Sequence, residues 1–322
     1  QLRDCAEKGL AAAKREGAEL EVFASWNELI TIRLNYTSDI PSSGVQEPKS
    51  TQSFGVGVLA SFKDKGKLTT GFGSESNDLR PRAVKEAFRK ARHCRFFDSD
   101  FRSLPTPAGI PTLVNYHDPL VMEARDGDIV ELGWKALEGA LKAFKERGIS
   151  KSIIVGGDVC VLKETIAIKS TLGIDDFDES TILTAAITTM VEDKGVKGTG
   201  WSTSTHLGQF NPGRAGLEAA ESAIRTLGGQ RVPSGLYHVV LGRQPVTELV
   251  SNIIAPSLSL FAVNASNTPF LGKLGKQVAS SNLSIYDDGA ILGQIGSKKI
   301  TCEGLPTGRT DLVTGGLLVG FL

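Results

Sequence analysis

The sequence has few of the residues from which metal and redox sites are built. Its four cysteines, Cys5, Cys94, Cys160 and Cys302, lie far apart and form no CxxC pair. A thiol-rich zinc site or a dithiol redox motif is therefore not expected. Dispersed, reduced thiols are typical of cytosolic proteins, so we expect a cytoplasmic location.

Histidine is equally scarce. No two of the four histidines, His93, His117, His206 and His238, are one helical turn apart, as a two-histidine zinc helix requires. His117 precedes Asp118, but a loop histidine beside an aspartate more often belongs to a turn or a helix cap than to a catalytic pair. The GxSxG motif of a serine hydrolase is also absent.

The chain has no excess of charge and no long apolar run. Lys+Arg and Asp+Glu both total 36 in 322 residues, so the formal net charge is zero. This balance lacks the basic footprint of a nucleic-acid-binding protein. No run approaches the roughly 18 apolar residues that span a bilayer, so no membrane segment is expected.

The order of helix and strand patterns predicts an α+β fold that begins with an N-terminal α+β domain, residues 1–108. A helix is expected over 2–16, a glycine-rich hairpin over 50–74 and a further helix from Pro81. The Pro-rich stretch 102–112 marks the end of this domain.

A middle α+β domain with antiparallel strands is expected over residues 109–229. The acidic stretch 173–180 is predicted to be a solvated turn between two of these strands. The glycine-rich stretch 195–201 does not stand between a strand and a helix, so we do not expect a phosphate-binding loop there.

Residues 230–322 are expected to start a β-rich C-terminal domain, with its first strand over 232–242. The sequence starts at Gln1 and finishes with the apolar stretch GGLLVGFL. We therefore expect it to be part of a longer protein, with this domain incomplete.

Residues 245–258, PVTELVSNIIAPSL, predict an amphipathic helix in this last domain. Its apolar stripe consists of Val246, Leu249, Val250, Ile253 and Ile254. We expect the stripe to face the core, which leaves Thr247, Glu248, Ser251 and Asn252 on the polar face.

Three carboxylates lie in glycine-rich turns further on. Asp287 and Asp288 precede Gly289, which favours a hairpin turn over paired acid/base catalysis. Glu303 is a less favoured turn residue, and Arg309 is either a carboxylate clamp or a surface charge.

Ordered elements along the whole chain resemble the TldD/PmbA (TldD/TldE) family of peptidases, once called modulators of DNA gyrase. They include the hairpin FGVGVLASFKDKGKLTTGFGS, the helix AVKEAFRKAR and the stretch STLGIDDFDESTILTAAITT. The densest match runs from FLGKLGKQVASSNLSIYDDG through GSKKITCEGLPTGRTDLVTGGLLVGFL.

In the catalytic, TldD-type subunits of this family, the helix that corresponds to 245–258 carries HExxxH, in which the histidines hold zinc and the glutamate is the general base. The resemblance aligns Thr247 and Asn252 with the two histidines, and Glu248 with the glutamate. Threonine and asparagine offer neither imidazole nor thiolate to zinc. The chain thus resembles the metal-free, TldE/PmbA-type subunit, with no metal or catalytic residue of its own.

The resemblance implies a partner subunit of a cytosolic metalloprotease that degrades or processes unfolded peptides. The partner would be a TldD-type homologue carrying the zinc, or a second copy of this chain. The matched EG-PT-R element makes Glu303, Gly304, Thr307 and Arg309 candidate peptide-binding residues.

Two other functions stay open, and with them the question of whether the chain is an enzyme. It could be a peptide-binding or scaffold homodimer without catalysis. It could also be a metal-independent hydrolase that uses Glu248, Asp287, Asp288 or Glu303.

Overall fold

The computed structural model describes residues 1–13, 19–40, 44–64 and 66–322. The chain forms two compact units. The first unit comprises Gln1–Gly229 and Leu292–Pro306, and the second comprises Gln230–Ile291 and Thr307–Leu322. The expected end of the first helix, at residues 14–16, lies outside the described residues.

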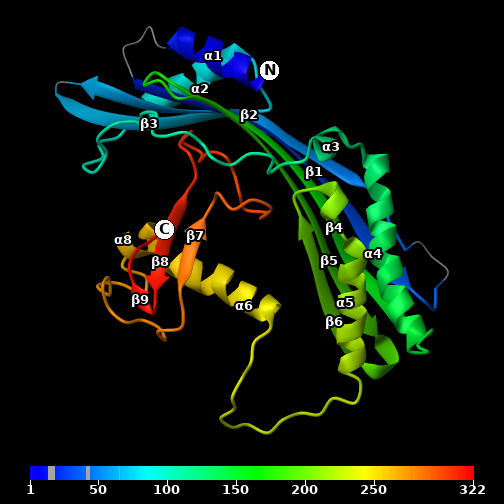
Figure 1. Ribbon diagram of the computed structural model, residues 1–322. Helices are drawn as coiled ribbons and strands as arrows, with labels where there is room; N and C mark the ends of the chain where they lie inside the picture. Colours follow the sequence, from blue (N-terminus) through cyan, green and yellow to red (C-terminus); the bar gives the residue numbers. More distant parts are fainter. Residues whose placement is uncertain (14–18, 41–43, 65) are drawn as a thin grey trace. The chain divides into compact units, whose positions relative to one another are not determined.

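The first unit is built on one six-stranded sheet with the order β3-β2-β1-β4-β5-β6, in which all neighbours are antiparallel (Figure 1). The strands are β1 (Glu19–Thr37), β2 (Lys49–Asp64), β3 (Lys67–Ser76), β4 (Ile153–Ser170), β5 (Asp175–Val191) and β6 (Val196–Ser204). Strands from both sides of the Pro-rich stretch 102–112 thus share one sheet. The three-part division at 1–108, 109–229 and 230–322 stays a prediction.

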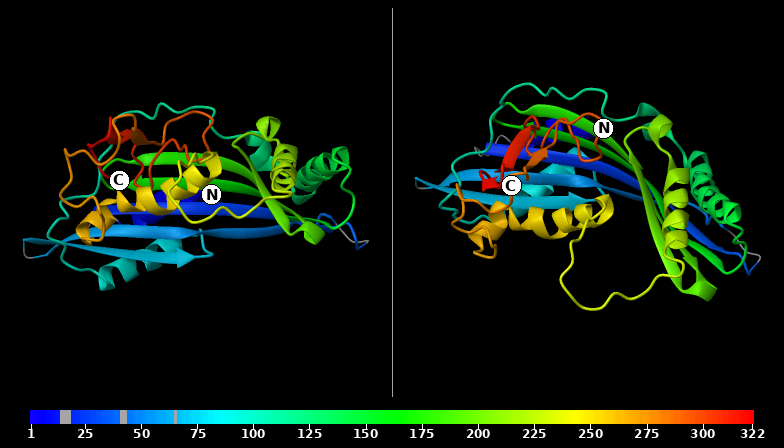
Figure 2. Two further views of the ribbon diagram at one scale, coloured as in Figure 1. Left: turned by 90° about the horizontal axis from the view of Figure 1, so that it is seen from below. Right: turned by 60° about the horizontal axis from the view of Figure 1, so that its bottom comes forward.

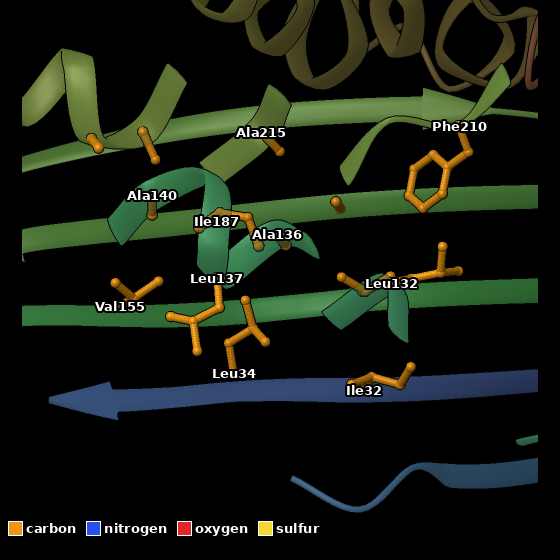
Figure 3. Close-up of a cluster of buried hydrophobic side chains, with 14 of the residues drawn as sticks. Ile32, Leu34, Leu132, Ala136, Leu137, Ala140, Val155, Ile187, Phe210 and Ala215 are labelled. Carbon is orange, nitrogen blue, oxygen red and sulfur yellow. The ribbon is translucent and has the colours of Figure 1, made fainter. Parts of the chain in front are cut away.

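Helices cover one face of this sheet. They are α1 (Leu2–Ala13), α2 (Pro81–His93), α3 (Pro119–Glu123), α4 (Asp126–Glu146) and α5 (Pro212–Arg225), with short 3₁₀ turns at Glu192–Lys194 and Leu207–Gln209. Alternate residues of β1 point to this face. Near its start they pack with α1 and α2, and near its end Ile32 and Leu34 pack with α4 and α5 (Figure 3).

The first unit consists of two halves with the same architecture. The first half is α1-β1-β2-β3-α2 and the second is α4-β4-β5-β6-α5, with β1 and β4 adjacent at the centre of the sheet (Figures 1 and 2). In the first half, a Cβ on Gly73 of β3 would lie 2.0 Å from the carbonyl oxygen of Ala87 in α2. In the second half, a Cβ on Gly200 of β6 would lie 2.0 Å from that of Ala215 in α5. Glycine at both positions lets a helix backbone rest directly on the outer strand.

The registers define which central residues correspond between the halves. In the first half, Gly73 of β3 pairs with Val58 of β2, which pairs with Val22 of β1. In the second half, Gly200 of β6 pairs with Ile187 of β5, which pairs with Gly157 of β4. Glu28 follows Val22 by the same number of residues as Lys163 follows Gly157, so Glu28 and Lys163 correspond between the halves. These two residues also pair directly across β1 and β4. The pseudo-twofold relation of the halves therefore passes between Glu28 and Lys163.

The second unit contains a continuous helical run and a small sheet. The run comprises α6 (Arg243–Leu249), a π-helical stretch (Val250–Ile254) and α7 (Ala255–Ser257), and α8 (Leu260–Asn264) follows. Strands β7 (Ile285–Asp288), β8 (Arg309–Thr314) and β9 (Leu317–Leu318) form the sheet. Its buried cluster is Leu258, Leu312, Val313 and Leu318.

The α+β fold class is confirmed, and so is the helix over 245–258. Three local predictions were wrong. Residues 232–242 form no strand, β5 begins at Asp175 inside the expected acidic turn, and Asp287 and Asp288 end strand β7. The helix stripe meets the core only at its end, where Ile254 packs against the buried cluster of the second unit, whereas Val246 and Ile253 are 41% and 60% exposed.

Candidate functional site

The polar face of the helical run makes local hydrogen bonds. The Thr247 hydroxyl donates to the carbonyl of Arg243 at 2.9 Å, and the Asn252 amide donates to the carbonyl of Glu248 at 2.9 Å. The Glu248 carboxylate accepts a 2.9 Å bond from the Gln244 amide. All three side chains are exposed and bound to neighbours one helical turn away.

These residues do not fit a zinc site. Thr247 offers a hydroxyl and Asn252 an amide, whereas structural and catalytic zinc is held by imidazole, thiolate and carboxylate groups. Across the described ranges of the chain, no group of three or more His, Cys, Asp or Glu is placed to hold a metal ion. Any chemistry derived for this chain alone must therefore proceed without a zinc step at Thr247, Glu248 and Asn252.

The candidate peptide-binding residues fall in different units. Glu303 and Gly304 belong to the first unit, where Gly304 has φ +75° and a Cβ on it would lie 2.5 Å from Ile174. Thr307 and Arg309 belong to the second unit. The Arg309 guanidinium bonds to Asp311 at 2.7 Å and lies 3.8 Å from the ring centroid of Tyr286. Their role in peptide binding stays a prediction.

The first unit holds a buried acid that the sequence analysis did not single out. Glu21 is 6% exposed on the sheet face opposite the helices, and its Oε2 has no hydrogen-bond partner among the described residues. Burial, followed by the nearby charge of Glu303, raises the pKa of Glu21 to about 7. Its position between the apolar Leu20 and Val22 was the available signal, because alternation places Glu21 on the opposite face of β1.

A second buried acid, Asp178, anchors the segment Leu292–Pro306 to the sheet. It is 3% exposed and accepts the N–H groups of Lys299 and Ile300 at 3.0 and 3.3 Å. The Tyr116 hydroxyl donates to the same carboxylate. Burial raises the pKa of Asp178, although these backbone N–H groups oppose the shift. The prediction of a solvated turn at this residue was wrong, because the segment covers it.

The segment is also held by ion pairs and apolar contacts. Lys298 pairs with Glu164, and Lys299 lies 3.4 Å from Asp176. Ile300 is buried with Ile166 and Ile168. Glu21 and Asp178 thus lie in an attachment between chain segments, and the printed hydrogen bonds of Asp178 hold that segment and Tyr116.

Comparison with known proteins gives these observations a family context. Residues 234–322 match the family described as "PmbA/TldA metallopeptidase C-terminal domain". An uncharacterised protein of Methanocaldococcus jannaschii is 24% identical over 317 residues, which are 98% of this chain and 69% of that protein. A metalloprotease TldD homologue of Haemophilus influenzae is 27% identical over 52% of this chain and 37% of its own length.

Two solved structures have the same fold. A putative modulator of a DNA gyrase from Thermotoga maritima has a TM-score of 0.80 and 20% identity, with 100% of this chain and 71% of that chain covered. TldE from Thermococcus kodakarensis has a TM-score of 0.70 and 20% identity, over 99% and 69% of the two chains. Within the described residues, no helix has the length and apolar character needed to traverse a bilayer.

Proposed function

We propose that this chain, which belongs to the TldD/PmbA family, is a metal-free subunit of a peptidase and pairs with a zinc-bearing homologue. The homologue would cleave unfolded peptides that the pair binds together. The observation that carries the proposal is the chemistry at Thr247 and Asn252, whose side chains donate to the helix backbone and offer no imidazole.

The exposed side of the same helical run supports a role in pairing. Val246, Leu249 and Ile253 are 41%, 39% and 60% exposed on one stripe, and apolar stripes of this kind are favoured at protein interfaces. A cytosolic setting is consistent with the four free cysteines.

The test is to measure zinc and peptide hydrolysis for the chain alone and for the chain mixed with an HExxxH-bearing homologue. We expect less than about 0.1 zinc per chain and no cleavage of an unfolded peptide by the chain alone. In the mixture we expect a co-purifying pair and cleavage that a chelator abolishes.

The rival functions predict different outcomes. A peptide-binding homodimer would bind peptide without cleaving it, and no homologue would change this. A metal-independent hydrolase would cleave in the presence of chelator and lose activity in Glu248→Gln but not in the control Glu221→Gln. About one zinc per chain would contradict the proposal directly.

A further inference from the structure

A cavity of about 320 Å³ lies on the face of the first unit's sheet that the helices leave uncovered. Its lining includes Phe23, Ser25, Gly57, Phe72, Ser74 and Ser76, which come from β1, β2 and β3. Phe23 and Ser25 follow Glu21 at alternate positions of β1, so their side chains share its face. The volume is at the small end of protein ligand sites and suits one large side chain with its adjoining backbone.

The register places Gly57 at the centre of this cavity. Gly57 pairs with Phe23 on one side and with Ser74 on the other. A Cβ on Gly57 would meet only the Phe72 ring, at 3.2 Å. At Gly55, in contrast, a Cβ would lie 2.4 Å from the carbonyl oxygen of Glu75. The approach of β3 therefore requires glycine at 55 but not at 57, where glycine leaves open space on the surface of the strand.

Two phenylalanine rings flank the space above Gly57. Phe23 packs against the buried cluster that contains Ile166 and Ile168, which holds its ring in place. Phe72 is 59% exposed and reaches over Gly57 from β3. The space thus has aromatic walls and a floor without a side chain, and aromatic rings contribute large apolar contact areas.

The polar groups of the cavity are neutral. The hydroxyls of Ser25, Ser74 and Ser76 make no hydrogen bond to another described residue, so each can donate to or accept from a ligand. Glu75 is the one charged residue among the described residues of the lining, and it pairs with Lys90 at 2.9 Å. This chemistry does not suit a phosphate or a metal ion. It suits a ligand with one apolar part and neutral hydrogen-bonding groups beside it.

We propose that this cavity binds a phenylalanine or leucine side chain of an extended peptide, whose backbone bonds to the serine hydroxyls. Ser74 lies beside Gly57, and Ser25 and Ser76 flank Gly55 in the next row. Peptide groups on both sides of the anchoring side chain would meet these hydroxyls, whereas a sugar would bring its own hydroxyls against the aromatic walls. The inference rests on the proposed function and names the side chain that this subunit selects in an unfolded substrate.

The experiment uses the whole chain labelled with 4-fluorophenylalanine and the capped peptide ASFSA as the probe. The fluorine signals are assigned with leucine variants of Phe23, Phe72, Phe144 and Phe210. We expect the Phe23 and Phe72 signals to shift saturably with peptide, and the signals of Phe144 and Phe210, which are buried under the helices, to stay unchanged. The peptide ASLSA should bind similarly, whereas ASASA and ASDSA should bind at least tenfold more weakly.

A matched pair of variants tests the site in the protein. Gly57→Val fills the space with a residue that strands favour, and it should weaken ASFSA binding at least tenfold. The control Gly156→Val lies on β4 outside the cavity, where a Cβ would meet only the Leu34 carbonyl oxygen at 3.8 Å, and it should bind like the parent. The proposal is overturned if the two variants bind alike, if ASASA binds as well as ASFSA, or if maltotriose shifts the signals and the peptides do not.

The mixture with an HExxxH-bearing homologue separates this inference from the proposed function. There we expect the parent to cleave ASFSA in preference to ASASA by kcat/KM. Gly57→Val should reduce this preference at least tenfold, whereas Gly156→Val should keep it. A mixture that cleaves peptides with the same preference in both variants would overturn the inference alone. A mixture that cleaves neither peptide would contradict the proposed function, while binding by the chain alone that Gly57→Val weakens would still support the peptide site.

Discussion

The two halves of the first unit use the same contacts at their outer strands and different contacts at their shared centre. Glycines of β3 and β6 both admit a helix backbone, at Gly73 against Ala87 and at Gly200 against Ala215. At the centre, the corresponding residues Glu28 and Lys163 have opposite charges and form an ion pair. Two identical charges facing each other there would be destabilising, so the halves share the contacts at their outer strands and differ at the centre.

The largest expected effect comes from breaking the shared glycine contact. Gly200→Val and Gly73→Val each place a Cβ within about 2 Å of a helix carbonyl oxygen, which only a shift of backbone can relieve. We expect each to destabilise the first unit by on the order of 4–5 kcal/mol, or to prevent folding. Urea unfolding would measure this.

The matched control is Gly208→Val, because a Cβ at Gly208 has nothing within 4 Å. Similar losses at Gly73 and Gly200, with a small loss at Gly208, would confirm that the two halves share this contact. If one of the two glycines tolerates valine as Gly208 does, the halves are not equivalent there.

The next effect tests the centre, where the halves differ. Lys163 Nζ lies 2.9 Å from Glu28 Oε2, and their side chains are only 4% and 13% exposed. Burial alone would raise the pKa of Glu28, but the hydrogen bonds from Lys163 and Gln52 outweigh it and lower the pKa. Lys163→Met leaves this carboxylate without a cationic partner and should cost about 3 kcal/mol of unfolding free energy.

A double-mutant cycle gives the decisive comparison. Glu28→Leu combined with Lys163→Met should regain most of the loss, because an apolar pair replaces two buried charges. A double variant that loses the sum of both single effects would show that the two side chains act independently.

Part of this architecture could be predicted from the sequence. The hairpin over 50–74 and the antiparallel strands within 109–229 could be predicted, because each strand has one apolar face against helices. The shared architecture of the two halves was not predicted. Its signals in the sequence were GFG on β3 and GTG on β6, each followed by a helix with alanines four residues apart. Their meaning depends on which strands lie at the sheet edges, and local pattern does not contain that information.

The candidate site was predicted less well than the fold. Thr247, Glu248 and Asn252 do lie on one helical run, but most of the stripe expected to face the core is exposed, and Ile254 at its end packs against the buried cluster. Asp178 in an acidic run was predicted to be solvated, since the segment that buries it, Leu292–Pro306, lies more than 100 residues later. Burial by a distant segment cannot be inferred from neighbouring residues.

The smallest expected effect is a pH dependence that belongs to the first half alone. Glu21 corresponds by register to Gly156 of the second half, which carries no carboxyl group. In the folded chain the pKa of Glu21 is raised to about 7 from its ordinary value of 4.5, so the folded state holds this proton more tightly than the unfolded chain. The contribution of Glu21 to stability is therefore fully present below about pH 4.5, and it is lost as pH rises toward 7 and above.

Glu21→Gln removes this loss, because a neutral amide needs no proton to stay buried. We expect the variant to gain on the order of 2 kcal/mol in unfolding free energy, relative to the parent, between pH 5 and pH 8. The exposed control Glu192→Gln should leave the pH profile unchanged, and Glu303→Gln should flatten it less than Glu21→Gln, since burial outweighs the charge of Glu303. Asp178 has a raised pKa as well, so some decline with pH should persist in every variant. A parent profile that rises from pH 5 to pH 8 would mean that Glu21 is ionised when folded, and its carboxylate would then need a cationic partner.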